Sequence, residues 1–268
     1  MQITIKGQSI AVATGGKPFD PAKPALIFIH GAGMDSTVWQ LPARAFAHRG
    51  FSVAAPDLPG DGRSGGTPLD SVAAMASFVT DLMSALKIER AALAGHSMGG
   101  AIALEAAATL GTRATALALI GTAGAIPVAP ALLATAKEAP DKAYKMMVQG
   151  AHSQGAKIGG SPVPGMWMSG LSLATFRSNS RDVLAIDLAA CNGWTTGADA
   201  AKRIACPTTV IMASADVMTP AKKGRELASL IPNAKTITIP NAGHMLMSEA
   251  PTALLKALVA ALPLPSAA

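Results

Sequence analysis

A serine lies on a predicted sharp turn between a strand and a helix. Ser97 stands in the run Gly95-His96-Ser97-Met98-Gly99, after the apolar segment 91–94 and before a helix predicted over 98–110. A residue at such a turn tends to adopt a strained backbone conformation, so the residues two before and two after it must be small. The first amides of the following helix favour negative charge in front of them. This context indicates a nucleophilic serine at an elbow-like turn.

Two further residues could activate this serine. A serine hydroxyl is a poor nucleophile at neutral pH, so it needs a base within hydrogen-bond reach, and the base needs an orienting acid. His244 follows the last predicted strand, and Asp216 follows the strand before it. The chain order Ser97, Asp216, His244 is the one expected when such a triad is built on a parallel sheet. The predicted strand ending at Ile120 is followed by no carboxylate, which favours Asp216 as the acid.

Backbone amides could stabilise the negative charge that forms when a nucleophile attacks a carbonyl. The run His30-Gly31-Ala32-Gly33 follows an early predicted strand, where a tight turn can aim amides at an oxyanion. We expect the amide of Ala32 and that of Met98, the residue after the candidate nucleophile, to form this oxyanion hole. His30 and His96 flank the site, and we expect them to shape the two turns through hydrogen bonds.

The elements that would position these residues alternate between strand and helix. Short continuous apolar runs predict strands covered on both faces, and the runs between them predict helices. We expect a hairpin over 3–12, strands at 25–30, 51–55, 91–94, 116–120, 208–212 and 236–239, and helices at 37–49, 70–86, 98–110 and 251–262. This alternation predicts an α/β protein with a parallel sheet and helices on both faces.

The alternation stops between residues 126 and 201. This stretch contains helical pieces and a glycine- and proline-rich patch at 159–165. We predict a helical cap over 126–201, inserted into a core made of residues 1–125 and 202–268. The last six residues of the chain, 263–268, are expected to be a loose tail.

Apolar side chains of the predicted cap could contact a substrate. Methionine adapts to irregular apolar shapes, so Met146 and Met166, together with Trp167, are candidates for lining a pocket. The alternative for all three is plain core filling. The two histidines that stand apart from the motifs, His48 and His152, are expected to be solvated.

The motifs together resemble those of the α/β-hydrolase superfamily, in its capped branch with a serine nucleophile. The similar segments are 30–33 with Trp39 downstream, 57–64, 95–99, Asp216 and the pair 243–244. The resemblance implies a mostly parallel eight-stranded sheet flanked by helices, with a helical cap inserted after the sixth strand. It also implies Ser97 as nucleophile, His244 as base and Asp216 as its partner.

The same resemblance separates branches of the superfamily. A serine at the turn disfavours the dehalogenases and epoxide hydrolases that use an aspartate nucleophile. The carbon–carbon bond hydrolases often carry a proline in the oxyanion loop and an asparagine before the nucleophile. Here those positions read Ala32-Gly33-Met34 and His96, which disfavours that activity.

Composition restricts the class of protein. The chain has 268 residues, of which 50% are hydrophobic and 14% charged, so it can bury a large core. The net charge of +6 is scattered and forms no basic stripe, which argues against a nucleic-acid partner.

Cys191 and Cys206 lie in no metal-ligand spacing and are expected to be buried thiols in a reducing compartment. No apolar run approaches the ~20 residues of a membrane helix, and the amino terminus lacks the layout of a signal peptide, so we expect a cytoplasmic protein.

The expected activity is hydrolysis, without metal or cofactor, of a carboxylic ester or related acyl bond. The substrate would be a small, largely apolar molecule, cleaved through an acyl-enzyme that water then releases. Lactone, thioester and carbon–carbon bonds are alternatives, because the cap selects the substrate and its sequence does not name one. A second alternative is a ligand-binding protein that keeps the fold without turnover. The sequence predicts neither the physiological substrate nor the oligomeric state.

Overall fold

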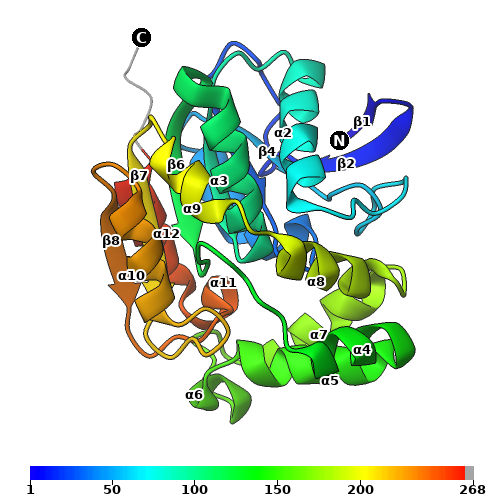
Figure 1. Ribbon diagram of the computed structural model, residues 1–268. Coiled ribbons are helices and arrows are strands. Elements are labelled where there is room, and N and C mark those ends of the chain that lie inside the picture. The colour runs from blue at the N-terminus through cyan, green and yellow to red at the C-terminus, as the bar shows by residue number, and fades with distance from the viewer. Residues whose placement is uncertain (263–268) are drawn as a thin grey trace.

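The computed structural model describes residues 1–262, which form eight strands, twelve α-helices and two short 3-10 helices (Figure 1). The strands are β1 (Gln2–Ile5), β2 (Gln8–Ala13), β3 (Ala25–Ile29), β4 (Ser52–Pro56), β5 (Ala91–His96), β6 (Ala114–Ile120), β7 (Thr208–Ala213) and β8 (Lys235–Ile239). The helices before β7 are η1 (Ser36–Trp39), α1 (Gln40–Ala47), α2 (Val72–Ala85), α3 (Met98–Leu110), η2 (Gly111–Arg113), α4 (Pro130–Glu138), α5 (Pro140–Ala151), α6 (Gln154–Lys157), α7 (Met168–Ser178), α8 (Val183–Gly193) and α9 (Gly197–Lys202). The helices after β7 are α10 (Ala221–Leu230), α11 (Leu246–Glu249) and α12 (Pro251–Ala261).

All eight strands belong to one sheet in the order β1-β2-β4-β3-β5-β6-β7-β8. β1, β2 and β4 pair antiparallel in turn, and every pairing from β4 to β8 is parallel. The mostly parallel eight-stranded sheet with flanking helices is therefore confirmed. The central strands β3, β5 and β6 are almost wholly buried, because their continuous apolar runs are covered by helices on both faces.

The register of the parallel strands brings their carboxyl ends together. Ile29 of β3 pairs with Gly95 of β5, His96 pairs with Ile120 of β6, and Ala213 of β7 pairs with the last residue of β8. The loops that follow β3, β5, β7 and β8 therefore start at one edge of the sheet. Ligands of open α/β sheets bind at this edge.

A group of helices stands in the connection between β6 and β7. The helices α4, α5, α7 and α8 lie together beyond the sheet (Figure 1), where α5 packs on α4 and α7. The last helix of the connection, α9, instead packs on α3 and α10, which flank the sheet. The predicted division at residues 126 and 201 stays a prediction.

Local signals decide where individual helices begin. The helix predicted over 70–86 starts after Ser71, whose side chain accepts a hydrogen bond from the amide of Ala74 at 3.3 Å. The helix predicted over 37–49 is split into η1 and α1. The predicted tail 263–268 lies outside the described residues. None of the helices within residues 1–262 is long and apolar enough to cross a membrane.

Candidate active site

Ser97 occupies a strained turn between β5 and α3. Its φ of 55° lies in the left-handed region, and its amide donates to the carbonyl oxygen of Ile120 at 2.9 Å. A Cβ on Gly95 would lie 2.0 Å from the carbonyl oxygen of Gly99, and a Cβ on Gly99 would lie 2.2 Å from that of Ile29. Only glycine fits at these two positions. This agrees with the expectation that the residues two before and two after the serine must be small.

His244 and Asp216 form a buried pair at the ends of β8 and β7. His244 Nδ1 lies 2.8 Å from Asp216 Oδ2. Asp216 Oδ1 accepts hydrogen bonds from the amides of Met218 and Thr219 at 2.8 and 2.9 Å. Burial alone would raise the pKa of Asp216, but the charge of His244 and hydrogen bonds from His244 and Thr219 outweigh burial and hold this pKa below its ordinary value. Asp216 is therefore an ionised acceptor for the imidazole.

The pairing fixes the proton on the imidazole. Because Nδ1–H of His244 donates to the Asp216 carboxylate, Nε2 carries the lone pair that can accept a proton. His96 Nε2 donates to the carbonyl oxygen of His244 at 2.9 Å, and the two rings lie 4.7 Å apart between centroids. Burial, followed by the neighbouring His244, lowers the pKa of His96 to about 3, so His96 is a neutral support for the loop. This agrees with the turn-shaping role expected for His96.

Ser97 and His244 both lie next to the peptide group between Ile120 and Gly121, at the end of β6. The Ser97 amide binds the Ile120 carbonyl oxygen, and a Cβ on the next residue, Gly121, would lie 3.5 Å from His244 Nδ1. Within residues 1–262, no hydrogen bond joins the Ser97 hydroxyl to the His244 ring. In enzymes without substrate such bonds are often long and tighten in the Michaelis complex. The structure thus joins His244 to Asp216 and places Ser97 beside them.

Two amides near Ser97 are free to bind a negative charge. In the turn after β3, the Met34 amide donates to Gly31 and the Gly33 amide to Asp187. The Ala32 amide donates to no acceptor in the described part of the chain. Met98 is the first residue of α3, where an amide has no partner inside its helix. A Cβ on Gly31 would lie 3.3 Å from Ser97 Cβ, so this turn lies against the serine.

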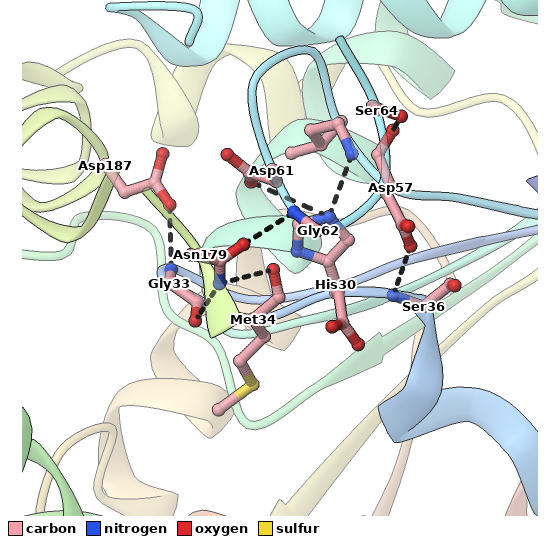
Figure 2. A network of polar contacts seen from close by, with 12 residues as sticks. His30, Gly33, Met34, Ser36, Asp57, Asp61, Gly62, Ser64, Asn179 and Asp187 are labelled. Carbon is pink, nitrogen blue, oxygen red and sulfur yellow. Dashed lines mark hydrogen bonds and ion pairs between the residues drawn. The ribbon is translucent and has the colours of Figure 1, made fainter. Parts of the chain in front are cut away.

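Residues between β6 and β7 support the turn after β3 (Figure 2). Asn179 Nδ2 donates to the carbonyl oxygen of Gly33 at 2.8 Å, and Asn179 Oδ1 accepts from the amide of Gly62 at 2.5 Å. Asp187 Oδ2, from α8, accepts from the amide of Gly33 at 2.8 Å. Asn179 and Asp187 could not be predicted from the sequence, because nothing in an irregular segment signals contact with a turn about 150 positions earlier.

A buried polar cluster lies behind the same turn (Figure 2). His30 Nε2 accepts from the amide of Leu58 at 3.0 Å, which leaves Nδ1–H to donate to Gly31. Burial lowers the pKa of His30, so the ring is neutral. Burial, followed by the negative charge of Asp187, raises the pKa of Asp61, and burial raises that of Asp187. His30 thus links two loops, as expected, beside two carboxyl groups that resist ionisation.

A pocket of about 530 Å³ opens beside these turns. Its wall includes Met34 from the turn after β3 and Met245, the neighbour of His244. Met166 lines the pocket as the sequence suggested. Trp167 is 70% exposed and Met146 is 39% exposed, and neither lines the pocket. The remaining lining residues are mostly from η1, α1, α7 and the α11 region: Thr37, Val38, Gln40, Leu41, Val163, Leu171, Ser172, Thr175, Met247, Ser248 and Pro251.

The expectation that His152 is solvated is wrong. Its side chain is buried at the end of α5, with Nε2 2.9 Å from Ser172 Oγ and Nδ1 3.4 Å from Glu249 Oε1. The reason is a long-range contact, because the amide of Met245 donates to Ala151 at 3.2 Å and draws the end of α5 onto the His244 loop. His48 is exposed, as expected.

The arrangement of sheet, serine turn and histidine loop defines a protein of the α/β-hydrolase class. A model of the alpha/beta hydrolase family matches residues 26–257, and the chain belongs to this family. The resemblance found in the sequence is thereby confirmed.

Individual relatives match the chain over different lengths. An uncharacterised protein of Mycobacterium tuberculosis is 47% identical over 83 residues, which cover 31% of this chain and only 24% of that protein. A proposed carbamate hydrolase of Klebsiella pneumoniae is 28% identical over 243 residues, or 84% of this chain and 85% of the relative.

Solved structures share the fold over nearly the whole chain. The enol-lactonase from Burkholderia xenovorans superimposes with a TM-score of 0.86 at 23% identity, covering 97% of this chain and 98% of the lactonase. A thermophilic esterase has a TM-score of 0.78 at 28% identity, covering 96% and 94% of the two chains.

Proposed function

We propose that this protein is a serine hydrolase that cleaves a carboxylic ester or related acyl bond through an acyl-enzyme, without a metal or cofactor. The observation that carries the proposal is the buried His244–Asp216 pair beside the strained Ser97 turn. Ser97 is the nucleophile, His244 is the base, and Asp216 orients the imidazole. The 28% identity with the proposed carbamate hydrolase and with the thermophilic esterase supports an acyl bond as the target.

The geometry suggests how each group acts. Ser97 Oγ attacks the carbonyl carbon while His244 Nε2 takes the hydroxyl proton, and the carbonyl oxygen becomes an oxyanion. The Ala32 and Met98 amides donate to that oxyanion. When the tetrahedral intermediate collapses, His244 returns the proton to the leaving oxygen. Water, activated by the same imidazole, then attacks the acyl-enzyme, and the acid is released with Ser97 restored.

The pocket indicates a small acyl substrate that is largely apolar. Residues 126–201 act as a cap over the core formed by 1–125 and 202–268, and Met166 is the predicted contact residue that we retain. The buried free thiols of Cys191 and Cys206 suit a reducing, cytoplasmic location.

Replacement of the serine tests the proposal. Ser97→Ala should lower kcat for p-nitrophenyl butyrate by at least about a thousandfold, since the nucleophile is lost. Ser77→Ala is the control, because Ser77 is an exposed serine of α2 whose hydroxyl donates to Ala73 of the same helix. A fluorophosphonate should phosphonylate Ser97 with loss of fluoride, so the peptide that contains Ser97 should gain the mass of the reagent less that of HF. Wild-type turnover by Ser97→Ala would refute the proposal.

A further inference from the structure

A second serine–histidine–carboxylate array, apart from Ser97, reaches the pocket through its serine, Ser172. Ser172 Oγ of α7 is 2.9 Å from His152 Nε2, and His152 Nδ1 is 3.4 Å from Glu249 Oε1. Glu249 Oε2 accepts hydrogen bonds from the amides of Gly243 and Ser153 at 2.9 and 3.2 Å. The array therefore ties the pocket wall to the loop that carries His244.

The contacts assign the protons in this array. Burial would raise the pKa of Glu249, but hydrogen bonds from His152, Ser153 and Gly243 outweigh burial and lower it, so the carboxyl is ionised. His152 Nδ1 and Glu249 Oε1 have no other polar partner within the described chain. A proton on Nδ1, directed at Glu249, satisfies both atoms, and the lone pair on Nε2 then accepts the hydroxyl hydrogen of Ser172.

The other hydroxyl groups of the pocket wall also give their hydrogens to the protein. Thr37 donates to Asp35, Thr175 donates to Leu171 at 3.1 Å, and Ser248 donates to Met245 at 3.1 Å. Toward a ligand, these oxygens can therefore only accept hydrogen bonds. Gln40, which can donate, is exposed at the rim.

Among these hydroxyl groups, Ser172 has the strongest need for a hydrogen-bond donor on the ligand. It is 6% exposed, whereas the side chains of Thr175 and Ser248 are only partly buried and Thr37 is exposed. Because the Ser172 side chain is buried, a ligand oxygen facing its lone pairs would leave two acceptors unpaired. A ligand hydroxyl or amide N–H would satisfy the serine oxygen.

We propose that the pocket selects an acyl substrate whose apolar chain carries a hydrogen-bond donor, a hydroxyl or an amide N–H, which binds Ser172 Oγ. This inference rests on the proposed function, and Ser172 is its specificity-determining residue. His152 and Glu249 are positioning residues that keep the Ser172 hydroxyl turned toward His152. Ser172 lies inside α7, where its own amide bonds within the helix, so it lacks the free amides that a nucleophile would need.

Matched substrates test the proposal. Each pair consists of a p-nitrophenyl ester with an amide in its acyl chain and the ketomethylene counterpart, in which CH2 replaces N–H. A series of pairs moves the amide along the chain. At one or more positions, wild-type kcat/KM should be roughly three- to tenfold higher for the amide, which is the usual effect of one neutral hydrogen bond. Ser172→Ala and Ser172→Cys should abolish the preference.

The control is Thr175→Val, which removes a hydroxyl from the same helix and the same pocket and should keep the preference. The preference is a ratio measured on one enzyme sample, so partial loss of folded protein does not change it. Equal rates for both members of every pair, or an unchanged preference in Ser172→Ala and Ser172→Cys, would overturn the proposal while Ser97→Ala still abolishes turnover. Turnover that survives in Ser97→Ala would instead refute the proposed function.

Discussion

Asn179 Nδ2 and the carbonyl oxygen of Gly33 are joined by a hydrogen bond of 2.8 Å across 146 positions of the sequence. This bond connects the helical segment between β6 and β7 to the turn whose Ala32 amide donates to no acceptor within residues 1–262. Asp187 binds the amide of Gly33 from the other side (Figure 2). The orientation of the Ala32 amide therefore depends on a segment that lies outside the sheet.

Loss of the Asn179 bond should reduce catalysis more than substrate binding. Asn179→Ala should lower kcat for p-nitrophenyl butyrate by about tenfold with little change in KM, because a misplaced amide donor weakens binding of the oxyanion rather than of the ground state. Asn192→Ala is the control, since Asn192 accepts from Val128 at an exposed place in the same segment. Equal kcat values for both variants and the wild type would show that the turn holds its shape without Asn179.

Neutralising the acid should impair the base. In Asp216→Asn, the amide can bind His244 in the wrong tautomer, so Nε2 would carry the proton and could not accept one. We expect kcat to fall by roughly 10³- to 10⁴-fold, with a far-ultraviolet circular dichroism spectrum like that of the wild type. If kcat fell by less than tenfold, the orienting acid would have to be another group.

The protonated state of Asp61 should make stability depend on pH. The pKa of Asp61 is raised by burial and by neighbouring carboxylates. At a pH above about 4, the ordinary pKa of an aspartate, the unfolded chain therefore releases a proton that the folded protein keeps. Stability is then highest in acid and declines as pH rises toward the raised value, by up to about 1.4 kcal/mol per pH unit. Asp61→Asn should flatten this decline and be more stable than the wild type at pH 8, as measured by urea unfolding from pH 5 to 8. Parallel pH profiles for the two proteins would contradict this assignment.

The tight contact of α3 with β3 should not tolerate a methyl group. A Cβ on Gly99 would meet the backbone carbonyl of Ile29, which cannot move aside like a side chain, so Gly99→Ala should destabilise the fold by more than about 3 kcal/mol. Gly155→Ala is the matched control, because a Cβ there meets nothing within 4 Å and alanine favours the helix. Thermal unfolding of the two variants measures the contrast, and similar midpoints would show that the turn can relax.

Local patterns were sufficient to predict the sheet and the contact between Asp216 and His244. Continuous apolar runs identify β3, β5, β6 and β7, and residues that follow neighbouring parallel strands must meet at one edge. The need for glycine around Ser97 could likewise be inferred from the type of turn.

Contacts made by the irregular segment could not be predicted in this way. Asn179, Asp187 and His152 carry no local signal, because their partners lie in loops far along the chain and depend on how the helices between β6 and β7 pack. Trp167 is the reverse case, in which a local signal had no matching contact. A large aromatic residue suggested a pocket lining, but Trp167 is 70% exposed and does not line the pocket.

The packing of α9 on α3 and α10 has a consequence for engineering. A connection between adjacent parallel strands needs a crossover of a dozen or more residues, commonly a helix laid on the sheet. α9 packs on α3 and α10 beside the sheet, so we expect it to serve as this crossover, together with the residues that flank it, when α4 to α8 are exchanged. We therefore expect residues 126–196, the part of the predicted cap that precedes α9, to be exchangeable. A graft from another family member should change substrate preference without redesign of the sheet, provided that it supplies counterparts of Asn179 and Asp187.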